Sequence, residues 1–139
     1  MNKIIENLRI AGLSGSPGKP GNRRHVAMWN RANFKCEYCG YELLKDLNSM
    51  RGAQLDHLLP QSRYPELKDI DDNWVLSCYS CNQFKRDFDP SESLKAPITT
   101  SNLFTHRTEF IKLAKDQIRL KSDPYNIILK DIKSKIEKK

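Results

Sequence analysis

The sequence lacks any long hydrophobic run. No stretch approaches the roughly 18–20 uncharged apolar residues that a membrane span needs, and only 38% of the 139 residues are apolar. Residues 1–10 carry charge throughout, without the apolar middle of a secretory signal. These absences exclude a membrane protein and lead us to expect a cytoplasmic chain with no membrane partner. The length suits one compact domain with extensions.

The net charge of +7 is unevenly distributed along the chain. Residues 1–40 hold seven basic and two acidic side chains, residues 41–100 hold seven and ten, and residues 101–139 hold ten and five. The two basic flanks could grip a polyanion while the acidic centre holds metal cations, as a nuclease requires. A solubilising surface would explain the same charges, so net charge alone does not decide for nucleic acid.

Cysteine is scarce, and its placement is informative. The four cysteines form two C-x2-C pairs, Cys36 with Cys39 and Cys78 with Cys81, and each pair with its two intervening residues is called a knuckle below. Without an export signal, disulfides are not expected, and a redox motif would not normally occur twice. Four thiolates make the tetrahedral sulfur set that Zn²⁺ prefers. We therefore expect a structural zinc that contributes to folding, because so small a protein has a limited core.

The segment between the two pairs is 38 residues long, whereas a simple zinc ribbon has roughly 15–20. The apolar stretch Leu55–Leu59, stopped by Pro60, predicts a strand followed by a loop. Residues Asn73–Leu76 predict a second strand, and a helix should start over Cys81–Lys85. The predicted order is strand, loop, strand, helix.

Four polar residues in this segment carry the chemistry of metal-assisted phosphodiester hydrolysis: Asp56, His57, Asn73 and Asn82. Carboxylate and carboxamide oxygens suit Mg²⁺ or Mn²⁺, and a neutral imidazole can take a proton from an attacking water. Adjacent strand residues point to opposite faces, so Asp56 and His57 share a direction only where the strand ends or twists. Singly, each residue has a plainer explanation as surface polarity, a turn residue or a helix cap.

The pattern C-x2-C, D-H-x-x-P-x-S, N-x-V-L, C-x2-C-N-x-x-K, over Phe34–Arg86, resembles the HNH endonucleases. The resemblance implies an α+β fold: a ββα-metal motif organised around the four-cysteine structural zinc, with flanking helices. It also implies a metal-dependent endonuclease that hydrolyses DNA, most often double-stranded, to 5′-phosphate and 3′-hydroxyl ends.

The resemblance further implies roles for individual residues. His57 matches the general base, Asp56 matches a ligand of the catalytic Mg²⁺ or Mn²⁺, and Asn73 matches the residue that holds the loop between the strands and orients the base. Asn82 stands where many relatives carry a metal-binding His, which is similar to the HNH domain of CRISPR effector nucleases. The missing imidazole should bias catalysis away from Zn²⁺ and Ni²⁺.

Three basic residues are candidates for DNA contact. Lys85 matches a family lysine near the phosphate and lies one helical turn after Asn82. Arg63 stands where relatives often carry glycine, and Arg86 follows Lys85. A solvated helix lysine is the plainer explanation for Lys85.

The chain should divide into three segments. Residues 1–22, rich in Gly and Pro near their end, predict a flexible basic arm. Residues 23–90 form the nuclease core, which begins with a short helix that packs Trp29 on a zinc knuckle. Residues 91–139 form a basic helical extension, with one helix from about Ser101 and another starting at Pro124, because proline suits a first helical turn.

Two other functions stay open on the sequence: a zinc-stabilised DNA-binding module that does not cut, and a zinc-organised protein-interaction domain. All three functions need the cysteines, but only the nuclease needs Asp56 and His57 together. Double-strand cleavage with one active site per chain calls for a homodimer or two sequential nicks, and no dimer interface can be read from the sequence.

Overall fold

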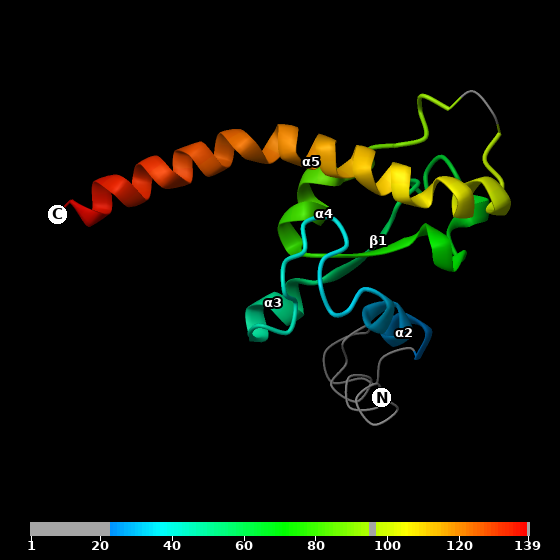
Figure 1. Ribbon diagram of the computed structural model, residues 1–139, viewed down its shortest axis with the longest axis horizontal. Coiled ribbons are helices and arrows are strands. Elements are labelled where there is room, and N and C mark those ends of the chain that lie inside the picture. The colour runs from blue at the N-terminus through cyan, green and yellow to red at the C-terminus, as the bar shows by residue number, and fades with distance from the viewer. Residues whose placement is uncertain (1–22, 95–96, 139) are drawn as a thin grey trace.

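The computed structural model describes residues 23–94 and 97–138, and the predicted arm 1–22 lies outside this part. It combines a small sheet with helices (Figure 1), which confirms the α+β class. The elements are α2 (Arg23–Arg31), α3 (Leu47–Gly52), β1 (Gln54–His57), β2 (Trp74–Ser77), α4 (Tyr79–Lys85) and α5 (Thr100–Glu137), with 3₁₀ turns at Pro65–Leu67 and Asp71–Asn73. Within the described residues, no helix is long and apolar enough to cross a membrane.

The sheet consists of β1 and β2, which pair antiparallel with Asp56 opposite Val75 and His57 opposite Trp74. Both strands and α4 were predicted, and the structure shifts their bounds by one or two residues. A two-stranded sheet is marginal in water by itself, so packing must stabilise it. Val75 joins a large buried cluster with residues of the knuckles and α5, while Leu76 joins a smaller cluster with Trp29 and Leu43.

Helix α2 covers the side of the sheet where the smaller cluster lies. Trp29 is buried there against Leu76, and Cys78 packs on the same cluster, as the sequence predicted. The helix ends at Arg31, and soon afterwards Asn33 and Phe34 have φ values of 55° and 59°. Those left-handed conformations cannot continue a right-handed helix.

Helix α5 is one helix of 38 residues with Pro124 inside it, so the prediction of two helices is wrong. Proline lacks the N–H that would bond to the Leu120 carbonyl. That part of α5 is exposed, with Leu120 at 72% and Tyr125 at 65%, so water can satisfy the carbonyl and the helix continues.

The first half of α5 belongs to the core. It buries Leu103, Phe110, Ala114 and Ile118 in the large cluster, and the C-terminal end of the helix extends beyond the body of the molecule (Figure 1). The predicted boundary at residue 90 stays a prediction, but the large core cluster includes four side chains from beyond it.

Two arginines connect helices α2 and α5 to the sheet through hydrogen bonds to the same acceptors. Arg107 of α5 and Arg31 of α2 each lie 3.2 Å from a carboxylate oxygen of Glu37. Both also donate to the Trp74 carbonyl, at 2.9 and 2.7 Å. Glu37 in turn accepts the Leu76 N–H at 2.7 Å. The beginning of β2, opposite His57, is thus held from two sides.

Candidate metal centres and active site

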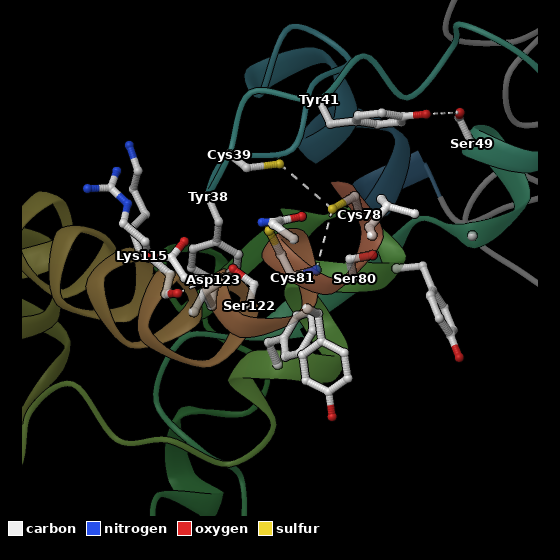
Figure 2. Close-up of a pocket in the computed structure, with 18 of the residues that line it drawn as sticks. Tyr38, Cys39, Tyr41, Ser49, Cys78, Ser80, Cys81, Lys115, Ser122 and Asp123 are labelled. Carbon is white, nitrogen blue, oxygen red and sulfur yellow. Dashed lines mark hydrogen bonds between the residues drawn. The ribbon is translucent and has the colours of Figure 1, made fainter. Parts of the chain in front are cut away.

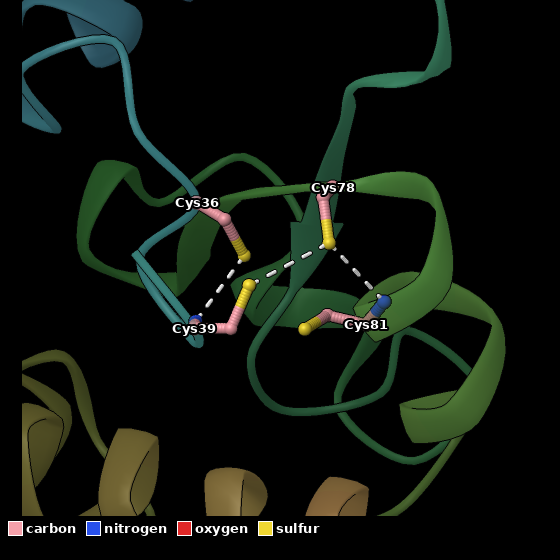
Figure 3. A group of neighbouring side chains, drawn as sticks. All are labelled: Cys36, Cys39, Cys78 and Cys81. Carbon is pink, nitrogen blue, oxygen red and sulfur yellow. Dashed lines mark hydrogen bonds between the residues drawn. The ribbon is translucent and has the colours of Figure 1, made fainter. Parts of the chain in front are cut away.

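The four cysteines converge from the loop after α2 and from the start of α4 (Figure 3). Their sulfurs all lie within 4.8 Å of one another, and Cys39 Sγ is 3.8 Å from Cys78 Sγ. Sulfurs bound tetrahedrally to zinc at about 2.3 Å would lie roughly 3.8 Å apart. The donor set and its spacing therefore fit Zn²⁺, as the sequence predicted.

Both knuckles use the same local geometry. The Cys39 N–H donates to Cys36 Sγ and the Cys81 N–H donates to Cys78 Sγ, each at 3.4 Å. Gly40 follows the first pair with φ of 79°, a conformation that favours glycine. The two-residue spacing thus turns each second cysteine back toward the first.

The close sulfurs also change one another's ionisation. Hydrogen bonds from Cys39, Cys78 and Cys81 lower the pKa of the Cys36 thiol far below its usual range. The same proximity, led by Cys36, raises the pKa of Cys81. The neighbouring sulfurs therefore favour the thiolates of Cys36 and Cys39 and oppose those of Cys78 and Cys81. A dication bound among them would offset two of the four thiolate charges and so stabilise the deprotonated thiols.

The second centre is built around the carboxylate of Asp56. Its Oδ2 accepts the Tyr38 hydroxyl at 2.8 Å and lies 3.1 Å from Lys85 Nζ. Its Oδ1 takes no hydrogen bond or ion pair from the described residues. Burial raises the pKa of Asp56, and Lys85 and Tyr38 act in the opposite direction. One carboxylate oxygen is thus held while the other is left for a further partner.

His57 is the last residue of β1, and its ring is held by the loop that follows. Nε2 lies 2.8 Å from the Lys68 carbonyl, which can only accept, so Nε2 carries the proton. In a neutral ring, Nδ1 then has the free lone pair. The ring also lies on Trp74, with ring centroids 4.5 Å apart.

Asp56 and His57 contact different neighbours, as strand alternation predicts. The Asp56 carboxylate meets Tyr38 and Lys85, whereas the His57 ring meets Trp74 and Lys68. Lys85 joins the two residues, because it also donates to the His57 backbone carbonyl at 2.9 Å.

Asn73 is completely buried and binds the loop between the strands. Its Oδ1 accepts the Leu59 N–H at 2.7 Å, and its Nδ2 donates to the carbonyls of Leu59 at 3.1 Å and Leu67 at 3.3 Å. Leu67 directly precedes Lys68, the partner of the His57 ring. The Asn73 side chain therefore anchors the backbone that holds His57.

Asn82 follows Cys81 in α4. It lies three residues before Lys85 and so on the same helix face, and Lys85 reaches Asp56 on β1. The Asn82 side chain is half-buried and makes no hydrogen bond with the described residues. The zinc knuckle thus fixes the backbone next to an amide that is free to bind a ligand.

The three candidates for DNA contact differ in their exposure to solvent and in their acidic partners. Lys85 is fully buried, with its ammonium on Asp56 and the His57 carbonyl. Arg63 is half-exposed and pairs with Asp89 at 3.1 Å and with Glu92 at 3.5 Å. Arg86 is exposed and has no acidic partner among the described residues. Their roles in DNA binding stay predictions.

Tyr38 is the site residue that the sequence reasoning missed. It lies inside the first knuckle, in C-E-Y-C, and is 1% exposed. A buried tyrosine hydroxyl usually needs a partner, which was the available signal. The sequence did not show that this partner is Asp56.

A groove of about 1090 Å³ lies between the knuckles, α4 and α5 (Figure 2). Its walls include Cys39, Tyr79, Lys115 and Tyr125. Asp56, His57 and Asn82 are not among its lining residues. The groove therefore borders the centre around Asp56 only through Tyr38, which lines the groove and donates to the Asp56 carboxylate.

The HNH endonuclease family model matches residues 36–88. This segment carries an HNH endonuclease domain. It contains all four cysteines, both strands and α4, so the resemblance seen in the sequence is confirmed, as is the ββα-metal HNH fold. The match covers somewhat more than a third of the chain, and members of this family are usually nucleases that bind nucleic acid. No curated protein matches the chain.

Proposed function

We propose that this protein is a metal-dependent DNA endonuclease that hydrolyses phosphodiester bonds to 5′-phosphate and 3′-hydroxyl ends. The observation that supports this best is the state of Asp56: its carboxylate is held through Oδ2, while Oδ1 takes no partner from the described residues. The zinc-bound cysteines would supply the scaffold.

Asp56 and Asn82 would hold one catalytic cation. They offer a carboxylate and an amide oxygen, both hard ligands, which suits Mg²⁺ or Mn²⁺ better than Zn²⁺. When bound, the cation would polarise the phosphate and stabilise the departing 3′ oxygen. The buried Lys85 next to Asp56 limits the negative charge that this part of the site contributes.

His57 would act as the general base. Nδ1 takes the proton of a water whose oxygen attacks phosphorus, the bond from phosphorus to the 3′ oxygen breaks, and that oxygen takes a proton from solvent. The Nε2–H bond to the Lys68 carbonyl maintains the tautomer and survives protonation, since both nitrogens of the charged ring donate. Asn73 supports this arrangement through Leu67.

Double-stranded DNA is the substrate that the charge distribution favours. The basic segments 1–40 and 101–139 flank an acidic centre, and phosphate contacts provide most of the affinity of such proteins. The exposed Arg86, close to Asn82 in the chain, is the DNA contact that we propose first. A homodimer is not required, because one site can nick one strand.

Nicking of supercoiled plasmid tests this function. Zinc-loaded protein is incubated with plasmid and Mg²⁺ or Mn²⁺, and His57→Ala is compared with His106→Ala. His106 is a matched control because it lies on α5 beside Glu109 and Phe110. We expect His57→Ala to keep zinc and DNA binding but to lose about 10²–10⁴-fold in cleavage rate, while His106→Ala nicks like wild type.

The two rival functions give different results in the same assay. Salt-sensitive DNA binding without cleavage by any protein sample would indicate a non-catalytic DNA-binding module. An absence of DNA binding at low salt would indicate a protein-interaction domain. Unchanged cleavage by His57→Ala would remove His57 from the mechanism.

A further inference from the structure

Lys85 is in an unusual position for a lysine, because lysine is almost never fully buried unless it is paired. Its side chain is 0% exposed, and Nζ lies 3.1 Å from Asp56 Oδ2 and 2.9 Å from the His57 carbonyl. Burying an ammonium is costly unless good partners compensate. The charge of Lys85 is therefore used inside the domain.

The two partners of Lys85 are consecutive residues, and the proposed reaction needs both. Lys85 binds Asp56 through its side chain and His57 through its main chain. A lysine that contacts DNA phosphate would need its ammonium at the surface. The geometry instead links α4 to the end of β1.

Tyr38 reaches the same carboxylate oxygen from the first zinc knuckle. Its hydroxyl is 2.8 Å from Asp56 Oδ2, and the side chain is buried. The knuckle and α4 thus converge on one oxygen of a residue on β1. Carboxylates that bind metals are commonly oriented in this way by hydrogen bonds from surrounding groups.

We propose that Lys85 and Tyr38 are positioning residues that hold Asp56 by Oδ2, so that Oδ1 is presented to the catalytic cation, and that Lys85 does not contact DNA. Lys85 also fixes the backbone of His57. This inference rests on the proposed function, because the cation at Asp56 is part of that proposal.

Two measurements on Lys85→Met separate positioning from phosphate contact. Methionine keeps much of the length of the side chain and removes its charge. We expect the affinity of zinc-loaded protein for Mn²⁺, measured without DNA by electron paramagnetic resonance, to fall about 10–100-fold. DNA affinity without Mn²⁺ and its salt dependence should stay at wild-type values. A phosphate-contacting lysine gives the reverse: weaker DNA binding, a salt slope smaller by about one and unchanged Mn²⁺ affinity.

Tyr38→Phe provides a second, milder test that leaves the Lys85–Asp56 ion pair intact. It should weaken Mn²⁺ binding without loss of zinc, and higher Mg²⁺ should restore its cleavage rate. Tyr41→Phe is the matched control, since Tyr41 is an exposed knuckle tyrosine whose hydroxyl meets Ser49 at 3.1 Å.

The outcomes decide between the proposals. Wild-type Mn²⁺ affinity in Lys85→Met, or equal affinities in Tyr38→Phe and Tyr41→Phe, overturns the positioning role while leaving the nuclease in place. If Lys85→Met does not fold, Tyr38→Phe alone decides. A wild-type protein that binds Mn²⁺ but does not nick DNA overturns the proposed function, and the Mn²⁺ comparison still tests positioning. A wild-type protein that binds no Mn²⁺ overturns both.

Discussion

The sulfur centre, formed by the four cysteines, and the oxygen centre, formed around the Asp56 carboxylate, both use residues of α4 but are built in opposite ways. The sulfur centre uses four identical residues whose atoms converge within 4.8 Å. The oxygen centre uses different residue types, and a buried lysine and tyrosine occupy one oxygen of its carboxylate. The first arrangement suits an enclosed ion that stabilises a fold. In the proposed mechanism, the second keeps a ligand atom available for the catalytic cation.

Cys78→Ser would alter the sulfur centre and is expected to have the largest effect. Apparent zinc-binding free energies in small zinc domains are about 10–16 kcal/mol, and Cys78 also caps α4. We expect loss of zinc and of the fold together, measured by zinc content and far-UV circular dichroism. A stably folded, zinc-free variant would contradict the role assigned to this centre.

Asp56→Ala would alter the oxygen centre and should have a smaller effect on stability. It leaves the Lys85 ammonium buried without its carboxylate, which should lower the free energy of unfolding by about 3–5 kcal/mol. Urea denaturation measures this change, and the native fraction should retain its zinc. Asp56→Ala combined with Lys85→Met should recover part of the loss. If Asp56→Ala alone were as stable as wild type, Asp56 and Lys85 would not form a buried ion pair in solution.

Asn82→His tests whether the residue at this position determines which ion is preferred, and it should have the smallest effect on stability of the three substitutions. An imidazole at this position should shift the preferred ion for cleavage from Mg²⁺ toward Ni²⁺ or Zn²⁺. Relative nicking rates with each ion measure the shift, and Gln83→His, on the exposed next residue, is the control. The same ion ranking in both variants would argue against Asn82 as a ligand.

The sulfur centre could be predicted from the sequence because two identical spacings specify four ligands and their geometry. The strands and α4 were also predictable, because Pro60 and the short apolar runs mark them. The burial of Lys85 could not be predicted, because a lysine in a short helix is usually solvated. Only the packing of α4 on β1 shows which face of the helix is buried. The continuation of α5 through Pro124 depends on solvent access to the Leu120 carbonyl, which a local proline rule does not include.

The central claim is that zinc maintains the fold while a separate hard cation enables cleavage. Its most direct test is to titrate Mg²⁺ into zinc-loaded protein that is free of other cations, and to follow plasmid nicking, zinc content and circular dichroism in one sample. We expect no nicking before Mg²⁺ is added, saturable nicking afterwards, and unchanged zinc content and fold throughout. Full nicking with zinc alone, or no nicking at saturating Mg²⁺ and Mn²⁺, would contradict it.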